Sequence, residues 1–322
     1  MPLLSIENLK MYFYTLRGWV RAVDDVSLSL EKGDSLGIAG ESGCGKTSAI
    51  LTLLRLLPRN GKVFGGKINF AGKDLLKLSD REFSKEIRWK KISTVFQGAM
   101  NSLHPTIKVG DQIVESITIH ESVSKEEAVK RAGKLLDLVG IGASRFDRYP
   151  HELSGGMKQR TMIAMSLACN PELVVLDEPT TALDVIIAAQ VLKVIKELQQ
   201  KLNLSTLLIS HDLSMIAETC NKIAIMYAGK VVEQGDIVSV FKETLHPYTQ
   251  KLIAAFPSVL GRKTELSSIH GFPPDLLTPP PGCRFHPRCD YAMEICRKEE
   301  PPVISAGKDH YVACWLVGGR KE

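Results

Sequence analysis

The segment Gly40–Thr47, which reads Gly-Glu-Ser-Gly-Cys-Gly-Lys-Thr, constrains the fold of this chain more than any other feature. It fits the pattern of glycine-rich loops that bind nucleotide phosphates, in which lysine and then threonine follow the last glycine. An apolar run at 35–39 precedes the loop, and a helical pattern over 47–57 follows it as far as Pro58. A strand, a loop and a helix in this order predict an α/β domain.

The chemistry of this loop can be derived from its residue types. Glycines let backbone N–H groups turn toward phosphates, and the following helix directs its positive end at the same charge. We expect Lys46 to reach the β- and γ-phosphates of ATP and the Thr47 hydroxyl to ligate Mg²⁺. The other loop residues expected to bind ATP are Gly40, Ser42, Gly43, Cys44, Gly45 and Ser48.

Two acids follow a second apolar run. Residues 173–176 read Leu-Val-Val-Leu, and Asp177 and Glu178 come directly after them. A strand buried on both faces reads in this way, and ligands of open α/β sheets sit at the carboxyl ends of such strands. Asp177 is expected to hold Mg²⁺ through water, and Glu178 is expected to orient and polarise the attacking water.

Periodicity along the chain gives a coarse map of its elements. Strand alternation dominates the first hundred residues, and helical patterns begin near 101, including one helix that starts at Ser124. A helix over about 185–202 lies between apolar runs at 173–176 and 206–209, which favours a parallel sheet. A hairpin is predicted over 223–233.

Composition limits the class of protein. The chain has 322 residues, of which 44% are hydrophobic and 24% charged, as in ordinary globular proteins. The net charge of +5 (41 basic minus 36 acidic residues) gives little support for nucleic acid as a partner. The N-terminus does not resemble a signal peptide, and no run reaches the about 18 apolar residues of a membrane span. We therefore expect any membrane association to come through a partner.

A third motif makes the chain similar to a known family. The run Leu153–Arg160, Leu-Ser-Gly-Gly-Met-Lys-Gln-Arg, resembles the signature of ABC (ATP-binding cassette) ATPases. Serine and two glycines opening a helix form a second anion-binding terminus. The resemblance implies that this terminus serves the ATP of a second chain in a head-to-tail dimer. The residues assigned to that role are Ser154, Gly155, Gly156, Gln159 and, from the loop 181–184, Asp184.

Further stretches match family elements in the right order. Gln97 resembles the glutamine that contacts Mg²⁺ and senses the γ-phosphate, and His211 resembles the switch histidine. The aromatic residue that stacks on adenine is best matched by Phe13, with Tyr12 and Tyr14 as alternatives. The implied catalytic residues are Glu178, His211, Gln97 and Lys46.

The resemblance implies a fold and a division of the chain. It predicts a P-loop ABC ATPase core over 1–255, with an antiparallel β-subdomain and a helical subdomain at about 101–165. Residues 256–322 are predicted to form a Pro-rich, irregular extension that carries a cysteine cluster.

A narrower match concerns the transport system. Three short segments look like those of oligopeptide/dipeptide importer ATPases: residues 149–157, residues 246–249, and Asn-Ser-Leu at 101–103. That resemblance implies two membrane permeases, a second ATPase subunit that is expected to form a heterodimer, and an external binding protein, with this chain at the cytoplasmic face of the membrane. Oligosaccharide or nickel uptake remains an alternative. A soluble ABC ATPase acting on nucleic acid and a non-hydrolysing regulatory module are less well matched.

One departure from the family pattern lies in the phosphate loop, where Cys44 replaces the usual serine. A thiol near a helix N-terminus can be oxidation-sensitive because its pKa is lowered there. The alternative interpretation is a small residue that the loop tolerates.

Four of the seven cysteines gather near the end of the chain: Cys283, Cys289, Cys296 and Cys314. Four thiolates can hold either zinc or an iron–sulfur cluster. The intervening gaps of five, six and seventeen residues exceed the about two to four residues usual between paired zinc ligands, which favours the larger cluster. The family resemblance also implies a [4Fe–4S] cluster, with zinc or free thiols as alternatives.

Overall fold

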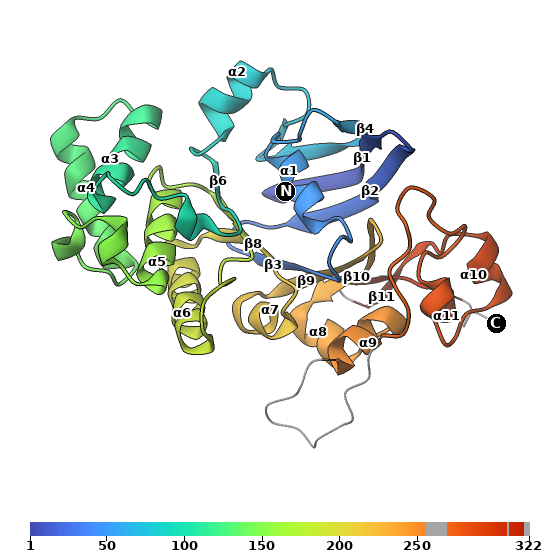
Figure 1. Cartoon of the computed structure of the whole chain (residues 1–322). Coiled ribbons are helices and arrows are strands. Elements are labelled where there is room, and N and C mark those ends of the chain that lie inside the picture. The colour runs from blue at the N-terminus through green and yellow to red at the C-terminus, as the bar shows by residue number, and fades with distance from the viewer. Residues whose placement is uncertain (256–268, 308, 319–322) are drawn as a thin grey trace. The chain divides into compact units, whose positions relative to one another are not determined.

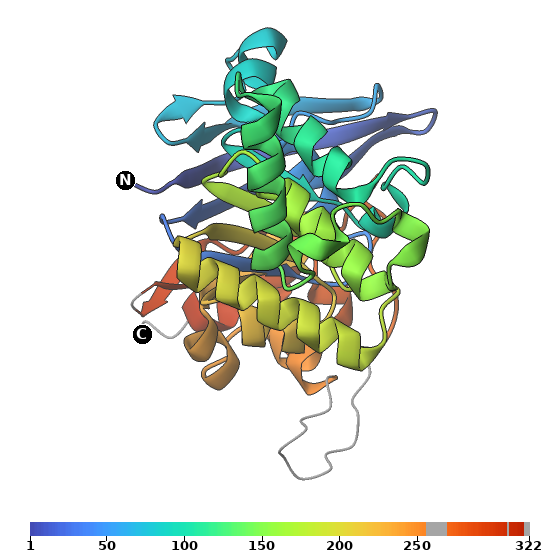
Figure 2. The same ribbon diagram turned by 90° about the vertical axis from the view of Figure 1, so that its left-hand side faces the viewer.

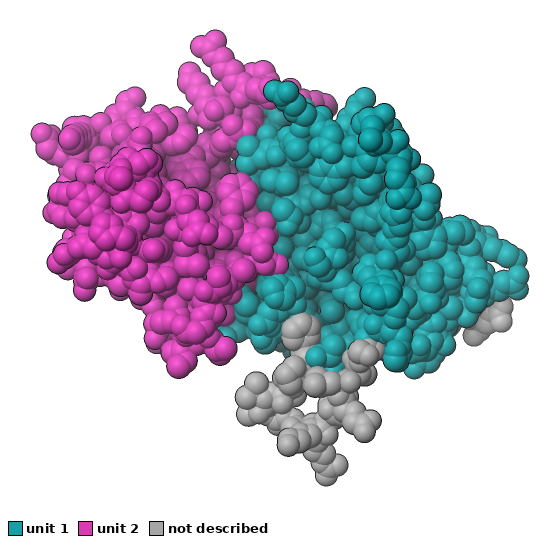
Figure 3. Space-filling model, viewed as in Figure 1, with its two compact units in different colours: residues 1–30, 36–76, 209–322 teal, residues 31–35, 77–208 magenta. Residues whose placement is uncertain are grey.

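The computed structural model describes residues 1–255, 269–307 and 309–318. It divides into two compact units, which Figure 3 colours teal and magenta. Unit 1 comprises residues 1–30, 36–76 and 209–322, and unit 2 comprises residues 31–35 and 77–208. The expected boundary between cassette and extension, at residues 255 and 256, adjoins a stretch outside the described residues.

The first part of unit 1 is a four-stranded antiparallel sheet in the order β2-β1-β4-β5. Its strands are β1 (Leu4–Thr15), β2 (Gly18–Leu30), β4 (Gly61–Phe70) and β5 (Lys73–Asp74). Alternate residues of β1, such as Leu4 and Ile6, are buried, as the period of two predicts. Figure 1 shows β1, β2 and β4 side by side.

A second set of strands in unit 1 has the order β11-β12-β10-β9-β3. These strands are β3 (Ser35–Ala39), β9 (Lys222–Tyr227), β10 (Lys230–Asp236), β11 (Val303–Gly307) and β12 (His310–Ala313). β3 runs parallel to β9, and the β9–β10 pair confirms the predicted hairpin. The accompanying helices are α1 (Lys46–Leu53), α7 (Leu213–Thr219), α8 (Ile237–Lys242) and α9 (Pro247–Ala254).

Unit 2 combines the strands β8-β7-β6 with most of the helices. The strands are β6 (Ile92–Val95), β7 (Leu173–Asp177) and β8 (Ser205–Ile209), and β6 runs parallel to β7. The α-helices are α2 (Asp80–Glu82), α3 (Val109–His120), α4 (Lys125–Leu138), α5 (Gly155–Ser166) and α6 (Val185–Leu202). Short helices are η1 (Phe83–Ile87), η2 (Ala99–Asn101), η3 (Ala143–Arg145) and η4 (Pro150–Glu152).

The helices of unit 2 begin and pack as their sequences predict. Ser124 caps α4 by accepting a hydrogen bond from the N–H of Glu127, and Ala128, Ala132 and Leu136 are the buried side chains of that helix. Helices α3, α4 and α5 contact one another, and Figure 2 shows α6 in yellow as the long helix of this unit. No helix in the described ranges is long and apolar enough to cross a membrane.

Two expectations from the sequence are corrected. The first helix ends at Leu53, not at residue 57, because Arg55 takes a left-handed φ of 52° that an α-helix cannot continue. The extension is also more regular than expected: it contains η5 (His286–Arg288), α10 (Glu294–Lys298), α11 (Trp315–Gly318) and the hairpin β11–β12. Strand β12 pairs with β10, so the extension adds strands to the sheet of unit 1.

A buried ion pair joins the extension to the antiparallel sheet. The Arg284 guanidinium donates to the Asp24 carboxylate and to the carbonyl of Ala228, and both side chains of the ion pair are at least nine-tenths buried. Tyr12 also donates to Asp24, at 2.7 Å, and burial together with this bond raises the pKa of Tyr12 to about 12. Burial alone would raise the pKa of Asp24, but the Tyr12 hydrogen bond and the Arg284 charge hold it below its ordinary value.

Replacing Arg284→Ala should lower the free energy of unfolding by about 3 kcal/mol, because a buried carboxylate would lose its cation. Since the folded-state pKa of Asp24 is depressed, this contribution is present at neutral pH and is lost as the pH falls through that pKa. Urea denaturation measures the change. Lys298→Ala removes an exposed ion pair with Glu294 and serves as the control, with an effect below about 0.5 kcal/mol. Equal effects of the two variants would contradict the assignment.

Candidate phosphate site and cysteine cluster

The glycine-rich loop connects β3 to α1 and depends on backbone conformations that favour glycine. Gly40, Gly43 and Gly45 have φ values of 149°, 78° and 105°. A Cβ on Gly40 would lie 2.1 Å from the carbonyl oxygen of Met226, and one on Gly45 would lie 2.0 Å from that of Ala22. No side chain fits at either position, so the loop is held against the backbones of β9 and β2.

Lys46 closes the loop from inside. Its side chain is buried, and its Nζ donates to the carbonyl oxygens of Gly40 at 2.7 Å and Glu41 at 3.0 Å. Within the described residues, α1 has neither a side-chain cap nor an acid in its first turn. A helix terminus and a lysine inside a loop of glycines suit an anionic ligand such as the phosphates of ATP. Thr47 is exposed and Ser48 half-buried at the start of this helix.

Sequence reasoning did not single out Glu41, although the structure fixes this loop residue at both its backbone and its side chain. The N–H of Glu41 donates to the Tyr248 hydroxyl at 3.0 Å. Its carboxylate accepts two hydrogen bonds from Arg288, which precedes Cys289 in the extension. In the sequence, Tyr248 stood out only because residues 246–249 match the importer family. Nothing in the sequence linked Arg288 to the loop.

The predicted catalytic residues divide between the two units. His211 and the phosphate loop belong to unit 1, whereas Gln97, Asp177 and Glu178 belong to unit 2. His211 lies between β8 and α7 and is exposed.

In unit 2 the structure brings Gln97 and Glu178 together. The parallel strands β6 and β7 end beside each other, and Gln97 Nε2 donates to Glu178 Oε2 at 2.8 Å. The Thr181 hydroxyl donates to the same carboxylate oxygen at 3.0 Å. Asp177 is 4% exposed at the end of β7, as expected of an acid delivered by a buried strand. Two hydrogen bonds therefore orient the Glu178 carboxylate.

The residues of the second anion site lie at two helix starts. Ser154 caps α5 by accepting from Met157 N–H at 3.4 Å, and Asp184 caps α6 by accepting from Ile187 N–H at 2.9 Å. Ser154, Gly155 and Asp184 are exposed. Gly156 is buried, and a Cβ there would lie 2.4 Å from Ile187 Cγ2. Gln159 is 3% exposed, so in this chain it packs inside unit 2.

The structure separates Phe13 from its two tyrosine neighbours. Tyr12 stacks on Phe64 with ring centroids 4.8 Å apart, and Tyr14 packs edge-on against Trp19 at 5.2 Å. Phe13 is half-buried and lies opposite Gly61 of β4, where a Cβ would lie 3.3 Å from its ring. Of the three aromatic residues, the two tyrosines are therefore engaged in a separate aromatic group.

The four clustered cysteines line one small cavity. Its lining also includes His246, Phe285, His286 and Trp315. Burial, together with the neighbouring thiols, raises the pKa of the Cys283 thiol to about 11. Burial also raises the pKa values of Cys289 and Cys314. The thiols are free, and in the parts of the chain that are described no three His, Cys, Asp or Glu side chains form a group that could hold a metal ion.

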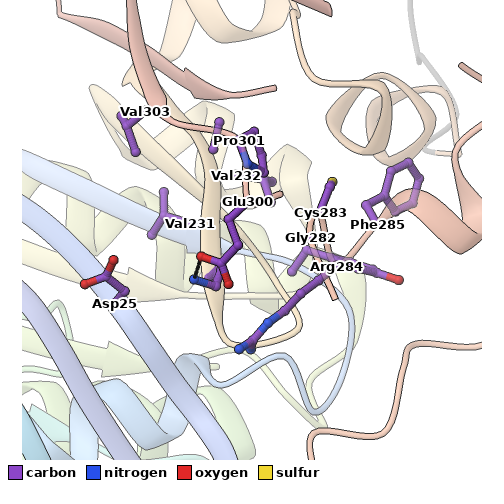
Figure 4. A pocket seen from close by; sticks show the side chains of 13 residues that line it. Asp25, Val231, Val232, Gly282, Cys283, Arg284, Phe285, Glu300, Pro301 and Val303 are labelled. Carbon is purple, nitrogen blue, oxygen red and sulfur yellow. Dashed lines mark hydrogen bonds and ion pairs between the residues drawn. The ribbon is translucent and has the colours of Figure 1, made fainter. Parts of the chain in front are cut away.

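A second cavity of about 80 Å³ lies beside the cysteines, between β10 and the extension. The Lys230–Glu300 ion pair lines it, with Asp25 and Arg284. Figure 4 shows the consecutive side chains of Cys283 and Arg284 pointing in opposite directions. This alternation sends Cys283 to the thiol cavity and Arg284 to Asp24.

Known proteins resemble this chain along most of its length. The ABC transporter family model matches residues 23–181, and the model of the oligopeptide/dipeptide transporter C-terminal region matches residues 232–296. The oligopeptide transport ATP-binding protein OppD of Bacillus subtilis is 46% identical over 319 residues, which cover 98% of this chain and 89% of that protein. The dipeptide transport ATP-binding protein DppD of Escherichia coli is 45% identical over 303 residues, covering 94% and 92%. A solved dimeric ATP-binding cassette, MJ0796 bound to ADP and Pi, shares 25% identity with a TM-score of 0.64, covering 73% of this chain and 98% of that one.

The Cys44 thiol should be unreactive in the folded chain. It is 4% exposed, and burial raises its pKa despite the nearby Lys46 ammonium, so the reactive thiolate is scarce. Alkylation of Cys44 at neutral pH, followed by mass spectrometry of its peptide, should be at least about tenfold slower than in urea. The Cys44→Ser variant is the control, because any alkylation that it still shows comes from the other cysteines. Alkylation at the unfolded rate, with loss of nucleotide binding, would instead support the oxidation-sensitive interpretation.

Proposed function

Because the chain belongs to the family of ATP-binding subunits of oligopeptide and dipeptide ABC transporters, we propose that it powers the uptake of short peptides through partner permeases. As a member of this family it is an ABC ATPase that couples ATP hydrolysis to transport. The match of residues 232–296 to the C-terminal region of these transporters is the observation that supports peptides as the substrate class. The proposal places the chain at the cytoplasmic face of the membrane, attached through the permeases.

The proposed nucleotide site assigns one role to each of the residues singled out in the sequence. Lys46 binds the β- and γ-phosphates, and Phe13 stacks on adenine. Thr47, Gln97 and, through water, Asp177 hold Mg²⁺, and His211 contacts the γ-phosphate. The Mg²⁺ ion neutralises phosphate charge in such sites. The observation that carries this assignment is the glycine loop closed by Lys46, whose geometry suits an anion.

Glu178 is proposed to act on the attacking water. A carboxylate that accepts hydrogen bonds from Gln97 and Thr181 at 2.8 and 3.0 Å is held in one orientation. A general base must be positioned before its basicity matters, and these two donors supply that positioning. Gln97 would thereby connect the Mg²⁺ ion to the carboxylate that polarises the water.

We propose that a second ABC subunit completes the site, with a heterodimer as the expected form. Ser154 and Asp184, which begin helices α5 and α6, are exposed to solvent, whereas Gln159 is buried inside unit 2. In this arrangement the α5 terminus, with Gly155 and Gly156, meets the ATP of the opposing subunit. In this proposal, residues 1–255 form the ATP-hydrolysing cassette, and residues 256–322 form an extension added to it.

Replacing Glu178→Gln should slow ATP hydrolysis by about a hundredfold or more while leaving MgATP binding intact, because the amide cannot accept the proton of water. The measurement is phosphate release by the complex assembled with its permeases, together with nucleotide retention. Glu172→Gln, which breaks an ion pair with Lys91 before the same strand, is the control and should hydrolyse normally. Turnover near the wild-type rate in Glu178→Gln would refute the role of Glu178.

We infer that the cysteine cavity holds a [4Fe–4S] cluster, with zinc as the alternative. All four thiols line one cavity. Burial raises the pKa values of Cys283, Cys289 and Cys314, so a bound metal would be needed to keep these three thiols ionised. The cluster would supply cross-links between η5, α10 and the start of α11, and its proposed role is structural.

The metal assignment predicts the composition of anaerobically purified protein. Iron and inorganic sulfide should be present in amounts that match one four-iron cluster in each chain, and Cys289→Ala should remove most of the iron. Cys220→Ala is the matched control, because this buried thiol lies outside the cavity. Stoichiometric zinc without iron would replace the cluster by the alternative, and no metal at all would leave free thiols.

A further inference from the structure

We propose that Arg288 of the extension is a positioning residue for the phosphate loop and that it acts through Glu41. This inference rests on the proposed role of the loop in binding ATP. It assigns to the extension a direct effect on nucleotide affinity, separate from any role of the cysteine cavity.

The contact between Arg288 and Glu41 has the geometry of a specific pair. Arg288 Nη1 donates to Glu41 Oε2 at 2.6 Å, and Nη2 donates to Glu41 Oε1 at 3.0 Å. Two parallel hydrogen bonds of this kind fix both the distance and the plane of a carboxylate. The Arg288 side chain is 5% exposed and that of Glu41 is 25% exposed, so water screens the pair only weakly.

Three further groups hold the guanidinium of Arg288 in place, and a fourth holds its backbone. Nε donates to the carbonyl of His270 at 2.9 Å, and Nη2 donates to that of Ile269 at 3.3 Å. Nη1 donates to the Tyr227 hydroxyl at 3.3 Å, and the Lys251 ammonium donates to the carbonyl of Arg288 at 3.1 Å. The cation is therefore fixed before it meets the loop, and little side-chain entropy remains to be lost.

Glu41 occupies a position where an unpaired charge would act directly on the ligand. Its carbonyl accepts from Lys46 Nζ at 3.0 Å, and Lys46 is the cation proposed to meet the phosphates. A bare carboxylate on this loop would repel a triphosphate, and a free side chain would loosen the backbone that carries the Lys46 contact. Arg288 neutralises the Glu41 carboxylate and also restricts the motion of its side chain. Tyr248 completes the arrangement by accepting the Glu41 N–H.

A competing explanation is that Arg288 only orders the extension through its bonds to 269 and 270. The two explanations predict different effects of removing the Glu41 carboxylate. If Arg288 acts through Glu41, removing the Glu41 charge in the same chain must recover what Arg288→Ala loses. If Arg288 only orders the extension, a change at Glu41 cannot recover it, so a double-mutant cycle separates the two.

The experiment measures MgATP affinity by titration with a fluorescent ATP analogue, and KM and kcat, on the full chain assembled with its partner subunits. Arg288→Ala should weaken affinity and raise KM on the order of tenfold, with kcat changed much less, because the bound state and not the chemical step is affected. The Arg288→Ala, Glu41→Gln double variant should recover most of this loss. Arg297→Ala, an exposed arginine that follows Cys296 in the same extension, is the control and should bind as the wild type does.

Unchanged affinity in Arg288→Ala would overturn the inference, and so would a loss that Glu41→Gln does not relieve. If Arg288→Ala fails to fold, Arg288→Lys replaces it: lysine keeps the charge but not the paired bonds, so a smaller loss, again relieved by Glu41→Gln, is expected. The same relief must appear, or the inference is wrong. Lys46→Ala tests the site separately, because retention of nucleotide by that variant would refute the phosphate site itself.

Discussion

The structure of unit 1 depends on a steric constraint, the close approach of two glycines to neighbouring backbones. Gly40 lies against the carbonyl of Met226 in β9, and Gly45 lies against that of Ala22 in β2. These contacts leave no room for a Cβ, so the loop is fastened to both sheets of the unit. The buried Lys46 ammonium then donates to two carbonyls that the loop holds in place, those of Gly40 and Glu41, and α1 begins directly after Gly45. The backbone of the loop and the Lys46 ammonium together suit an anionic ligand.

Much of the candidate site could be predicted because its determinants are local. Ser154 and Asp184 are helix-capping residue types placed just before helical patterns, and both cap helices in the structure. Asp177 follows a short apolar run and lies at the end of a buried strand. Local residue type was sufficient for these three residues. The contact between Gln97 and Glu178 was not predicted, because it depends on the parallel strands β6 and β7 ending at the same edge of a sheet.

The features that could not be predicted depend on contacts between distant parts of the chain. The pair Arg288–Glu41 joins positions 247 residues apart, and neither residue carries a local pattern that reveals the other. The hairpin β11–β12 was missed because its order comes from pairing with β10, not from its own proline-bordered sequence. The packing of Tyr12 on Phe64 and of Tyr14 on Trp19 could not be predicted either, because the partner rings come from other strands.

The pairing of Asp24 with Arg284 also has a consequence for synthesis of the chain. These residues are 260 positions apart, and unit 1 is interrupted by the whole of unit 2. A ribosome makes the antiparallel sheet before unit 2, and the arginine that neutralises its buried acid emerges only after unit 2 has been made. During that interval the nascent chain holds an unpaired Asp24 and an uncovered edge of β10, which is the kind of surface that recruits other strands. The first sheet therefore gains its buried cation and β10 gains its edge partner only late in synthesis, and a chain truncated before Arg284 would remain exposed to aggregation and proteolysis.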